Sequence, residues 1–268
     1  MHRLLSAVLL GAGLLAATAA HADDEALRAA IAGPQRSPAN VLRDGARHPY
    51  ETLTFFGIRP DMKVIELVPE GGWYTEILAP YLSANGMYVA AGNDPDSKDE
   101  KTRAAAARLV DKLHSNPAFS KAVVGVFEPP LRYKFGVDGG ADMILTFRNV
   151  HNWLKYDDPQ VKILFAALYS ALKPGGVLGI EEHRLPEKMR QDATASTGYV
   201  HESYVIRLAQ EAGFKLVAKS EINANPADNA QHEGGVWALP PTYKNKDVDR
   251  AKYSAIGESD RMTLKFVK

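Results

Sequence analysis

The sequence has 268 residues, of which 46% are apolar and 24% charged; its formal net charge is zero and it contains no cysteine. This composition is that of a folded globular chain with room for one large domain and extensions. The balanced charge gives no reason to expect nucleic acid or a membrane surface as a partner, and the lack of cysteine excludes disulfides, thiolate metal sites and a cysteine nucleophile.

The N-terminus is typical of a secretory signal peptide. A short positive start at His2 and Arg3 precedes an apolar run, and Ala20-His21-Ala22 forms a small-x-small cleavage site. We expect cleavage after Ala22 and a periplasmic or secreted mature protein without stable membrane insertion. A single membrane anchor is the alternative, although the apolar run is short and alanine-rich for a span.

The rest of the chain alternates between strand and helix patterns. Apolar runs suited to strands fall at residues 63–67, 87–91, 122–127, 141–147, 177–181 and 214–220. Helical patterns fall at residues 49–56, 73–82, 101–113, 159–172 and 200–212. This alternation predicts an α/β fold with a doubly wound, mostly parallel Rossmann-like sheet. The last residues, 262–268, are expected to add a final antiparallel strand.

The stretch VIELVPEGGWYT, residues 64–75, begins like the cofactor-binding turn of a Rossmann-type domain. Glu66 is an acid at the end of the first strand, and Gly72 stands where a helix can start. Val68 and Glu70 occupy two positions where such a turn usually keeps glycine for unusual dihedrals and close approach to a ligand. A valine there is stiff, and a glutamate adds a carboxylate beside the ligand.

The loop FRNVHNW, residues 147–153, follows a buried strand at the edge of the sheet where ligands bind. Arg148 is suited to an anionic substrate group and Asn149 to orienting a hydrogen-bond donor. His151 is a candidate general base, because its ordinary pKa lies near neutral pH. Trp153 is a candidate apolar wall. The alternative is a helix-capping loop in which His151 and Trp153 only pack.

Other polar residues are expected at the same edge. They are His183, Arg184, Tyr199 and His201, which are candidates to converge with His151. Several histidines raise the question of a metal, but no pair has the short helical spacing of a metal motif, so no metal site is predicted. The segment IGESDRM, residues 256–262, either folds back over the site or forms a solvated turn.

From residue 49 to residue 220 the chain resembles the class I S-adenosylmethionine-dependent methyltransferases. LKPGGVLGIEEHR, residues 172–184, resembles the helix end, Pro-Gly-Gly turn and fifth strand of that family. ADMILTFRNVHNW and YVHESYVIRLAQEAGFKLV resemble its fourth strand with the following loop and its later helix and strand. More closely, the chain resembles a group of exported bacterial proteins described as methyltransferases from sequence alone.

The resemblance implies S-adenosylmethionine as cofactor and a small-molecule methyl acceptor. Glu66 then takes the acid position and Gly72 that of the last glycine in the cofactor motif. Glu70 departs from the motif: its carboxylate would attract a sulfonium or amino group and repel a carboxylate. The alternative role for Asn149, besides orienting a donor, is to hold the methionine part of the cofactor.

The ribose and adenine positions implied by the resemblance are less regular. The ribose acid falls in register on Gly92, so Asp94 is the expected ribose ligand and Asn93 the next candidate. The alternative for Asp94 is a helix cap or turn. Phe127 and Glu128 are candidates for the edge of an adenine pocket, or else a core residue and a solvated turn.

These observations divide the chain into a signal peptide (1–22), an N-terminal helix and linker (23–48), a methyltransferase-like Rossmann domain (49–222) and a loop-rich extension that adds the last strand (223–268). The expected function is methyl transfer from S-adenosylmethionine to a small molecule. The alternative is a non-catalytic or repurposed ligand-binding protein on the same fold in the periplasm, because the turn is altered and export removes the chain from the cytoplasmic cofactor supply.

Overall fold

The computed structural model describes residues 24–130 and 132–268. The predicted signal peptide, residues 1–22, lies outside the described residues. Within these two ranges, no helix has both the length and the apolar character needed to cross a membrane.

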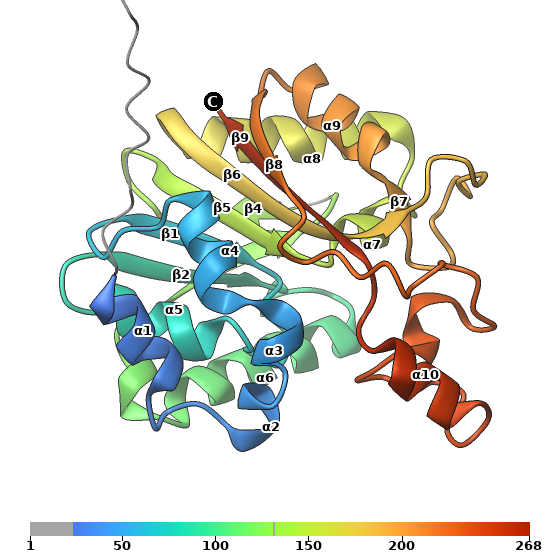
Figure 1. Cartoon of the computed structure of the whole chain (residues 1–268). Helices are drawn as coiled ribbons and strands as arrows, with labels where there is room; N and C mark the ends of the chain where they lie inside the picture. The colour runs from blue at the N-terminus through green and yellow to red at the C-terminus, as the bar shows by residue number, and fades with distance from the viewer. Residues whose placement is uncertain (1–23, 131) are drawn as a thin grey trace, which may run out of the picture.

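Among the described residues, nine strands form a central sheet (Figure 1). They are β1 (Lys63–Leu67), β2 (Met87–Gly92), β3 (Val123–Glu128), β4 (Arg132–Lys134), β5 (Ala141–Phe147), β6 (Leu172–Leu185), β7 (Val200–His201), β8 (Lys215–Ser220) and β9 (Arg261–Val267). The order is β4-β3-β2-β1-β5-β6-β9-β8, with β7 paired to β6 off this path. Strands β3, β2, β1, β5 and β6 are parallel, whereas β9 is antiparallel to β6 and β8. The predicted fold class is confirmed.

Helices cover both faces of the sheet. They are α1 (Glu25–Ala32), α2 (Pro38–Val41), α3 (Asp44–Arg47), α4 (Pro49–Phe56), α5 (Thr75–Leu82), α6 (Glu100–His114), α7 (Val150–Trp153), α8 (Asp158–Ala171), α9 (Glu202–Glu211) and α10 (Arg250–Ile256), with 3-10 turns η1 (Pro117–Phe119) and η2 (Gly235–Ala238). Successive strand residues point to opposite faces. Val64 therefore joins a core under α1, α4, α5 and α6, and Ile65 joins a second core under α8 and α9.

Local sequence signals account for several element ends. Helix α4 ends at Gly57, as predicted, with φ 82° and its amide bonded to the Leu53 carbonyl. Other boundaries differ: the helix predicted from residue 200 begins at Glu202, because Val200 pairs with Arg184 to form β7. Strand β6 is longer than the predicted 177–181, and the short strands β4 and β7 were not predicted.

Residues 33–47, which include α2 and α3 and are called the N-terminal segment here, are fixed against the edge of the sheet by Glu76, a buried acid of α5. One carboxylate oxygen of Glu76 accepts the Ser37 amide at 3.0 Å, and the other accepts the Lys112 ammonium at 2.6 Å. The Trp73 indole donates to the Asn40 carbonyl at 2.9 Å. These bonds hold α2 and α3 beside the carboxyl ends of β1 and β5.

Candidate functional site

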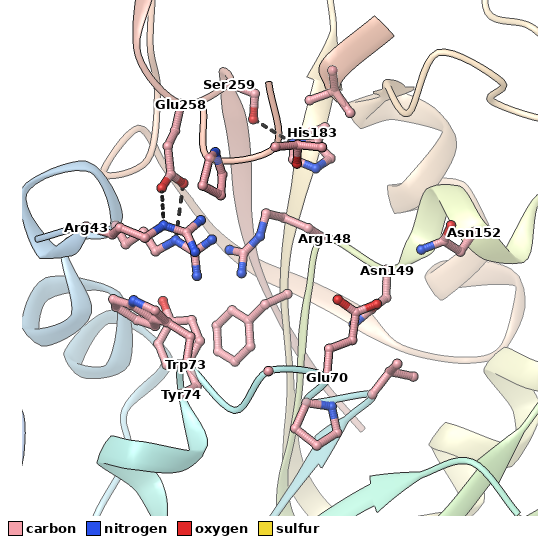
Figure 2. A pocket seen from close by; sticks show the side chains of 18 of the residues that line it. Arg43, Glu70, Trp73, Tyr74, Arg148, Asn149, Asn152, His183, Glu258 and Ser259 are labelled. Atoms are coloured by element: carbon pink, nitrogen blue, oxygen red, sulfur yellow. Dashed lines mark hydrogen bonds and ion pairs between the residues drawn. The ribbon is translucent and has the colours of Figure 1, made fainter. Parts of the chain in front are cut away.

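A cavity of about 460 Å³ lies at the carboxyl ends of β1, β5 and β6 (Figure 2). We call it the main cavity. Its walls come from six parts of the chain: residues 40–47, the end of β1 with residues 68–74, residues 147–152, His183 of β6, residues 236–242, and residues 258–259. Its volume is within the range typical of small-molecule sites, and its position is where parallel α/β sheets bind ligands.

The turn after β1 keeps the backbone shape of a glycine turn although two glycines are missing. Val68, Glu70 and Gly72 have φ values of 49°, 45° and 74°. This left-handed region is unfavourable for a side-chain-bearing residue and most unfavourable for a β-branched one. The Val68 amide donates to the Ala91 carbonyl at 2.8 Å and so fixes the turn to β2. Glu70 is exposed on the cavity wall, as predicted for a residue facing the ligand space.

Glu66 lines the main cavity but is almost fully buried. Its carboxylate accepts the Tyr88 hydroxyl at 2.5 Å and the Thr75 hydroxyl at 3.4 Å. Burial raises the pKa of Glu66 to about 7, despite these hydrogen bonds and the charge of Arg148. Gly72 lies behind this wall, where an added Cβ would meet the Lys112 side chain at 3.0 Å. Gly72 lines neither of the two cavities, and its left-handed backbone, at φ 74°, is what favours glycine at this position.

The loop after β5 brings three predicted residues to the cavity. Arg148, at φ 60°, donates through its guanidinium to Glu181 at 2.8 Å. The Asn149 amide donates to the Leu67 carbonyl at 3.1 Å and so ties this loop to the end of β1. His151 is the second residue of α7 and is buried at the cavity wall. Trp153, in contrast, packs in the core against Phe127, as the alternative interpretation had it.

His151 and a carboxylate of β6 form a buried pair. The Nδ1 atom of His151 lies 2.9 Å from Oε1 of Glu182, which is fully buried. Burial alone would lower the pKa of His151, but the charge and hydrogen bond of Glu182 outweigh it, and the pKa is raised. A carboxylate-held imidazole is suited to accept a proton from a bound group.

His183 lies beside this pair, with its ring centre 5.3 Å from that of His151. Its Nδ1 is 2.6 Å from the Ser259 hydroxyl. Burial, followed by the charge of His151, holds the pKa of His183 well below its usual value. Among the described residues, His151, Glu182 and His183 have ligand atoms within 4.8 Å of one another, the spacing that could hold a metal ion. The positive charge of Arg148 beside them opposes a cation.

Several residues of the cavity were not predicted from the sequence. Arg43 and Arg47 reach it from the N-terminal segment, and both donate to Glu258. Tyr74 stacks on Phe147 with ring centres 3.6 Å apart. Of the segments that carry these residues, only 256–262 was a candidate from the sequence. Its charged, glycine-bearing turn was expected either to fold over the site or to lie in solvent. The structure places its Glu258 and Ser259 in the cavity wall.

The predicted ribose and adenine residues lie elsewhere. The Asp94 carboxylate is bound by Arg132, and Asp94 lines neither the main cavity nor a second cavity of about 440 Å³ on the other side of the turn. Asn93 lines the second cavity. Phe127 is a core residue with 1% of its surface exposed, and Glu128 accepts the Asp94 amide.

The remaining candidates do not line the main cavity. Arg184 binds Asp260 and Glu221, and the Tyr199 hydroxyl donates to Asp228. His201 contacts the Met189 carbonyl through Nε2 at 2.9 Å. Arg184 and Tyr199 thereby hold the C-terminal extension, through Asp260 and Asp228, against the end of β6 and the residue before β7.

Comparison with known proteins gives a fold assignment. No protein-family model and no curated protein sequence matches the chain. An S-adenosylmethionine-dependent methyltransferase from Aquifex aeolicus has a similar structure, with a TM-score of 0.53, 17% identity, and coverage of 86% of this chain and 93% of that chain. A protein provisionally assigned as a sarcosine dimethylglycine methyltransferase from Galdieria sulphuraria gives a TM-score of 0.54, 13% identity, and coverage of 85% and 84%. The fold is that of S-adenosylmethionine-dependent methyltransferases.

The Aquifex aeolicus protein depends on S-adenosylmethionine, and the described residues of this chain offer partners for one half of such a molecule. Its sulfonium and amino groups are cationic, and Glu66 and Glu70 give the main cavity an acidic side. Asn149 stands beside the same turn. The ribose half has no acidic partner at the end of β2 among the residues that line the two cavities, since Asp94 is bound to Arg132 and Asn93 offers an amide instead.

Proposed function

We propose that the protein is an S-adenosylmethionine-dependent methyltransferase that acts on a small molecule. The observation that carries the proposal is the left-handed backbone at Val68, Glu70 and Gly72, which keeps the shape of a cofactor turn at the switch-point edge of the sheet. When bound, the cofactor supplies a methyl group on a positively charged sulfur. Glu66 and Glu70 would hold its cationic amino-acid half, with Asn149 beside them.

In this proposal the chain's own residues position the acceptor and remove its proton. Methyl transfer needs no covalent enzyme intermediate, only alignment of the acceptor and, for a protonated acceptor, a base. His151 is the base, and Glu182 fixes its ring and raises its pKa. Arg148 faces the same cavity and is suited to an anionic group of the acceptor. We also propose that the protein acts in the periplasm or outside the cell after its signal peptide is cleaved.

One observation favours a second function, a repurposed ligand-binding protein. Val68 and Glu70 narrow the turn and add negative charge, and Asp94 is drawn to Arg132 instead of facing a cavity. On this view the main cavity binds a different small molecule and no methyl group is transferred.

Titration calorimetry with S-adenosylmethionine and S-adenosylhomocysteine separates the two functions. We expect saturable 1:1 binding of both to the wild type. The variant Val68→Gly, which keeps Glu70, should bind S-adenosylmethionine about tenfold more tightly, because glycine removes the side chain that hinders backbone approach and costs less at positive φ. A wild type that binds neither compound, together with a glycine variant that gains no binding, would contradict the methyltransferase and favour the ligand-binding protein.

A further inference from the structure

Three arginines line one side of the main cavity and arise from separate parts of the chain. Arg43 and Arg47 come from the N-terminal segment, and Arg148 follows β5. Figure 2 shows Arg43 and Arg148 on this side of the cavity. The Nε atoms of Arg43 and Arg47 donate to the two oxygens of Glu258, at 2.8 and 3.1 Å. The Nη2 atom of Arg43 is buried and has no hydrogen-bond partner among the described residues. We call these three residues the arginine cluster.

The charges around the arginine cluster do not balance. Arg261 lies beneath it, 3.0 Å from Glu181 and 3.2 Å from Glu258, and Arg148 also binds Glu181. Four guanidinium groups thus share two directly paired carboxylates, so this ion-paired group contains two more positive than negative charges. Burial of unbalanced charge is costly. Consistently, the pKa of Arg47 is lowered by burial and then by Arg148, which outweigh the carboxylates.

We infer that the arginine cluster binds the anionic group, a carboxylate or a phosphate, of the substrate of the proposed methyltransferase. Guanidinium groups match the geometry of both anions and form charge-assisted hydrogen bonds with them. Aromatic side chains stand next to the cluster: Trp73 lies 4.8 Å below the Arg47 guanidinium, and Phe147 and Trp237 also line the cavity. The substrate class is therefore a small anion with a flat apolar body. This inference rests on the proposed function.

The opposite side of the cavity is formed by the turn after β1, where the carboxylate of Glu70 repels an anion. Glu70 lies across the cavity from Arg43 and Glu258, as Figure 2 shows. The acidic side attracts the positive end of a ligand, and the arginine cluster attracts the negative end. The competing occupant of the cluster is thus the carboxylate of the cofactor itself, and the experiment must separate it from a substrate.

The test titrates the whole chain with benzoate, phenyl phosphate and the neutral benzamide. We expect at least one anion to bind about tenfold or more tightly than benzamide, because charge-assisted hydrogen bonds to guanidinium groups are stronger than those between neutral groups. The tighter of the two anions identifies the carboxylate or the phosphate as the preferred group. Equal affinity for the anions and benzamide, or no binding of any of them, overturns the inference.

Variants locate the binding. Arg47→Met keeps an apolar stem without the charge and should weaken anion binding about tenfold or more. Arg207→Met is the matched control, because Arg207 pairs with Glu211 on the exposed side of α9, away from the cavity. The comparison of ligands on the wild type still decides the matter if Arg47→Met fails to fold. A folded Arg47→Met that binds anions as the wild type does contradicts the inference.

S-adenosylhomocysteine separates this inference from the proposed function. Anion binding that is unchanged by saturating S-adenosylhomocysteine supports a substrate site apart from the cofactor. Strict competition between the two overturns the inference, because the cluster is then the cofactor's carboxylate pocket, while the methyltransferase proposal stands. Anion binding without any S-adenosylhomocysteine binding supports the anion site and contradicts the methyltransferase.

Discussion

Glu66 shows how one buried acid can link the site to stability. The residue is 3% exposed and its carboxyl group is held by Tyr88 and Thr75. Its pKa of about 7 lies above the ordinary 4.5 because of burial. The folded state therefore binds this proton more tightly than the unfolded state does. The contribution of Glu66 to the free energy of unfolding is therefore largest below about pH 4.5, and it is lost as the pH rises towards 7.

Glu66→Gln should remove that pH dependence. A shift from 4.5 to about 7 corresponds to about 3 kcal/mol. The free energy of unfolding of Glu66→Gln, relative to that of the wild type, should therefore be about 3 kcal/mol higher at pH 8 than at pH 4.5. Urea unfolding at both pH values measures this, with Glu233→Gln, on the exposed surface, as control. Parallel pH curves for Glu66→Gln and the wild type would contradict the prediction.

The buried pair of His151 and Glu182 predicts how the activity depends on pH. A base must be unprotonated to act, so the raised pKa of His151 places the acidic limb of kcat/KM above the pH of an ordinary histidine. Glu182→Gln keeps the size of the side chain and removes its charge, and should lower the pKa of His151 and move the limb to lower pH. An NMR titration of the His151 imidazole measures the pKa without an activity assay. His114, in the last turn of α6, is the internal reference. An unshifted His151 titration in Glu182→Gln would argue against the pairing.

At the scale of elements, the site depends on how α2 and α3 are held. Glu76 in α5 joins this segment, through the Ser37 amide, to Lys112 of α6. Arg36 forms a two-bond fork with Asp44, at 2.6 and 2.8 Å, inside the same segment. Arg43 and Arg47 therefore reach the cavity from a backbone that a buried acid secures.

Glu76→Gln should loosen this segment. Both oxygens of Glu76 accept hydrogen bonds, whereas glutamine replaces one of them with an NH2 group that can only donate. We therefore expect a loss of about 2 kcal/mol in the free energy of unfolding and faster hydrogen exchange at the Ser37 amide. Lys112→Met breaks the same ion pair from the other side, and the double variant should lose less than the sum of the two. Additive losses with unchanged exchange at Ser37 would show that Glu76 does not secure the segment.

The sequence predicts elements well where their ends carry chemical signals. Strand β5 was predicted with its observed bounds because its apolar residues are buried on both faces, and α4 because Pro49 and Gly57 mark its ends. Strands β4 and β7 were missed because two or three residues show no periodicity. In the site, Glu66, Arg148 and His151 could be placed together because strand ends share an edge. Arg43 and Glu258 follow no strand, and only the tertiary fold brings them there.

For the whole molecule, the export prediction remains to be tested. Asp24, two residues after the predicted cleavage site, already caps α1, and its amide donates to the Tyr50 hydroxyl at 3.0 Å. Cleavage after Ala22 would therefore leave every described contact in place. Mass spectrometry of protein recovered from the periplasm or medium should give a chain that starts at Asp23. An intact Met1 on protein found in the cytoplasm would contradict export and would restore access to the cytoplasmic cofactor supply.

The link between Arg43 and Glu258 also bears on the order of folding. These residues are 215 positions apart, so their contact closes a very long loop. Closing such a loop lowers the entropy of the chain before the contacts at its ends can stabilise it, so contacts between distant residues form late in folding. The sheet can assemble from neighbouring strands while the arginine side of the cavity is still open. Recognition of an anion then becomes possible only after both ends of the chain have docked, and the ligand stabilises none of the earlier, partly folded forms.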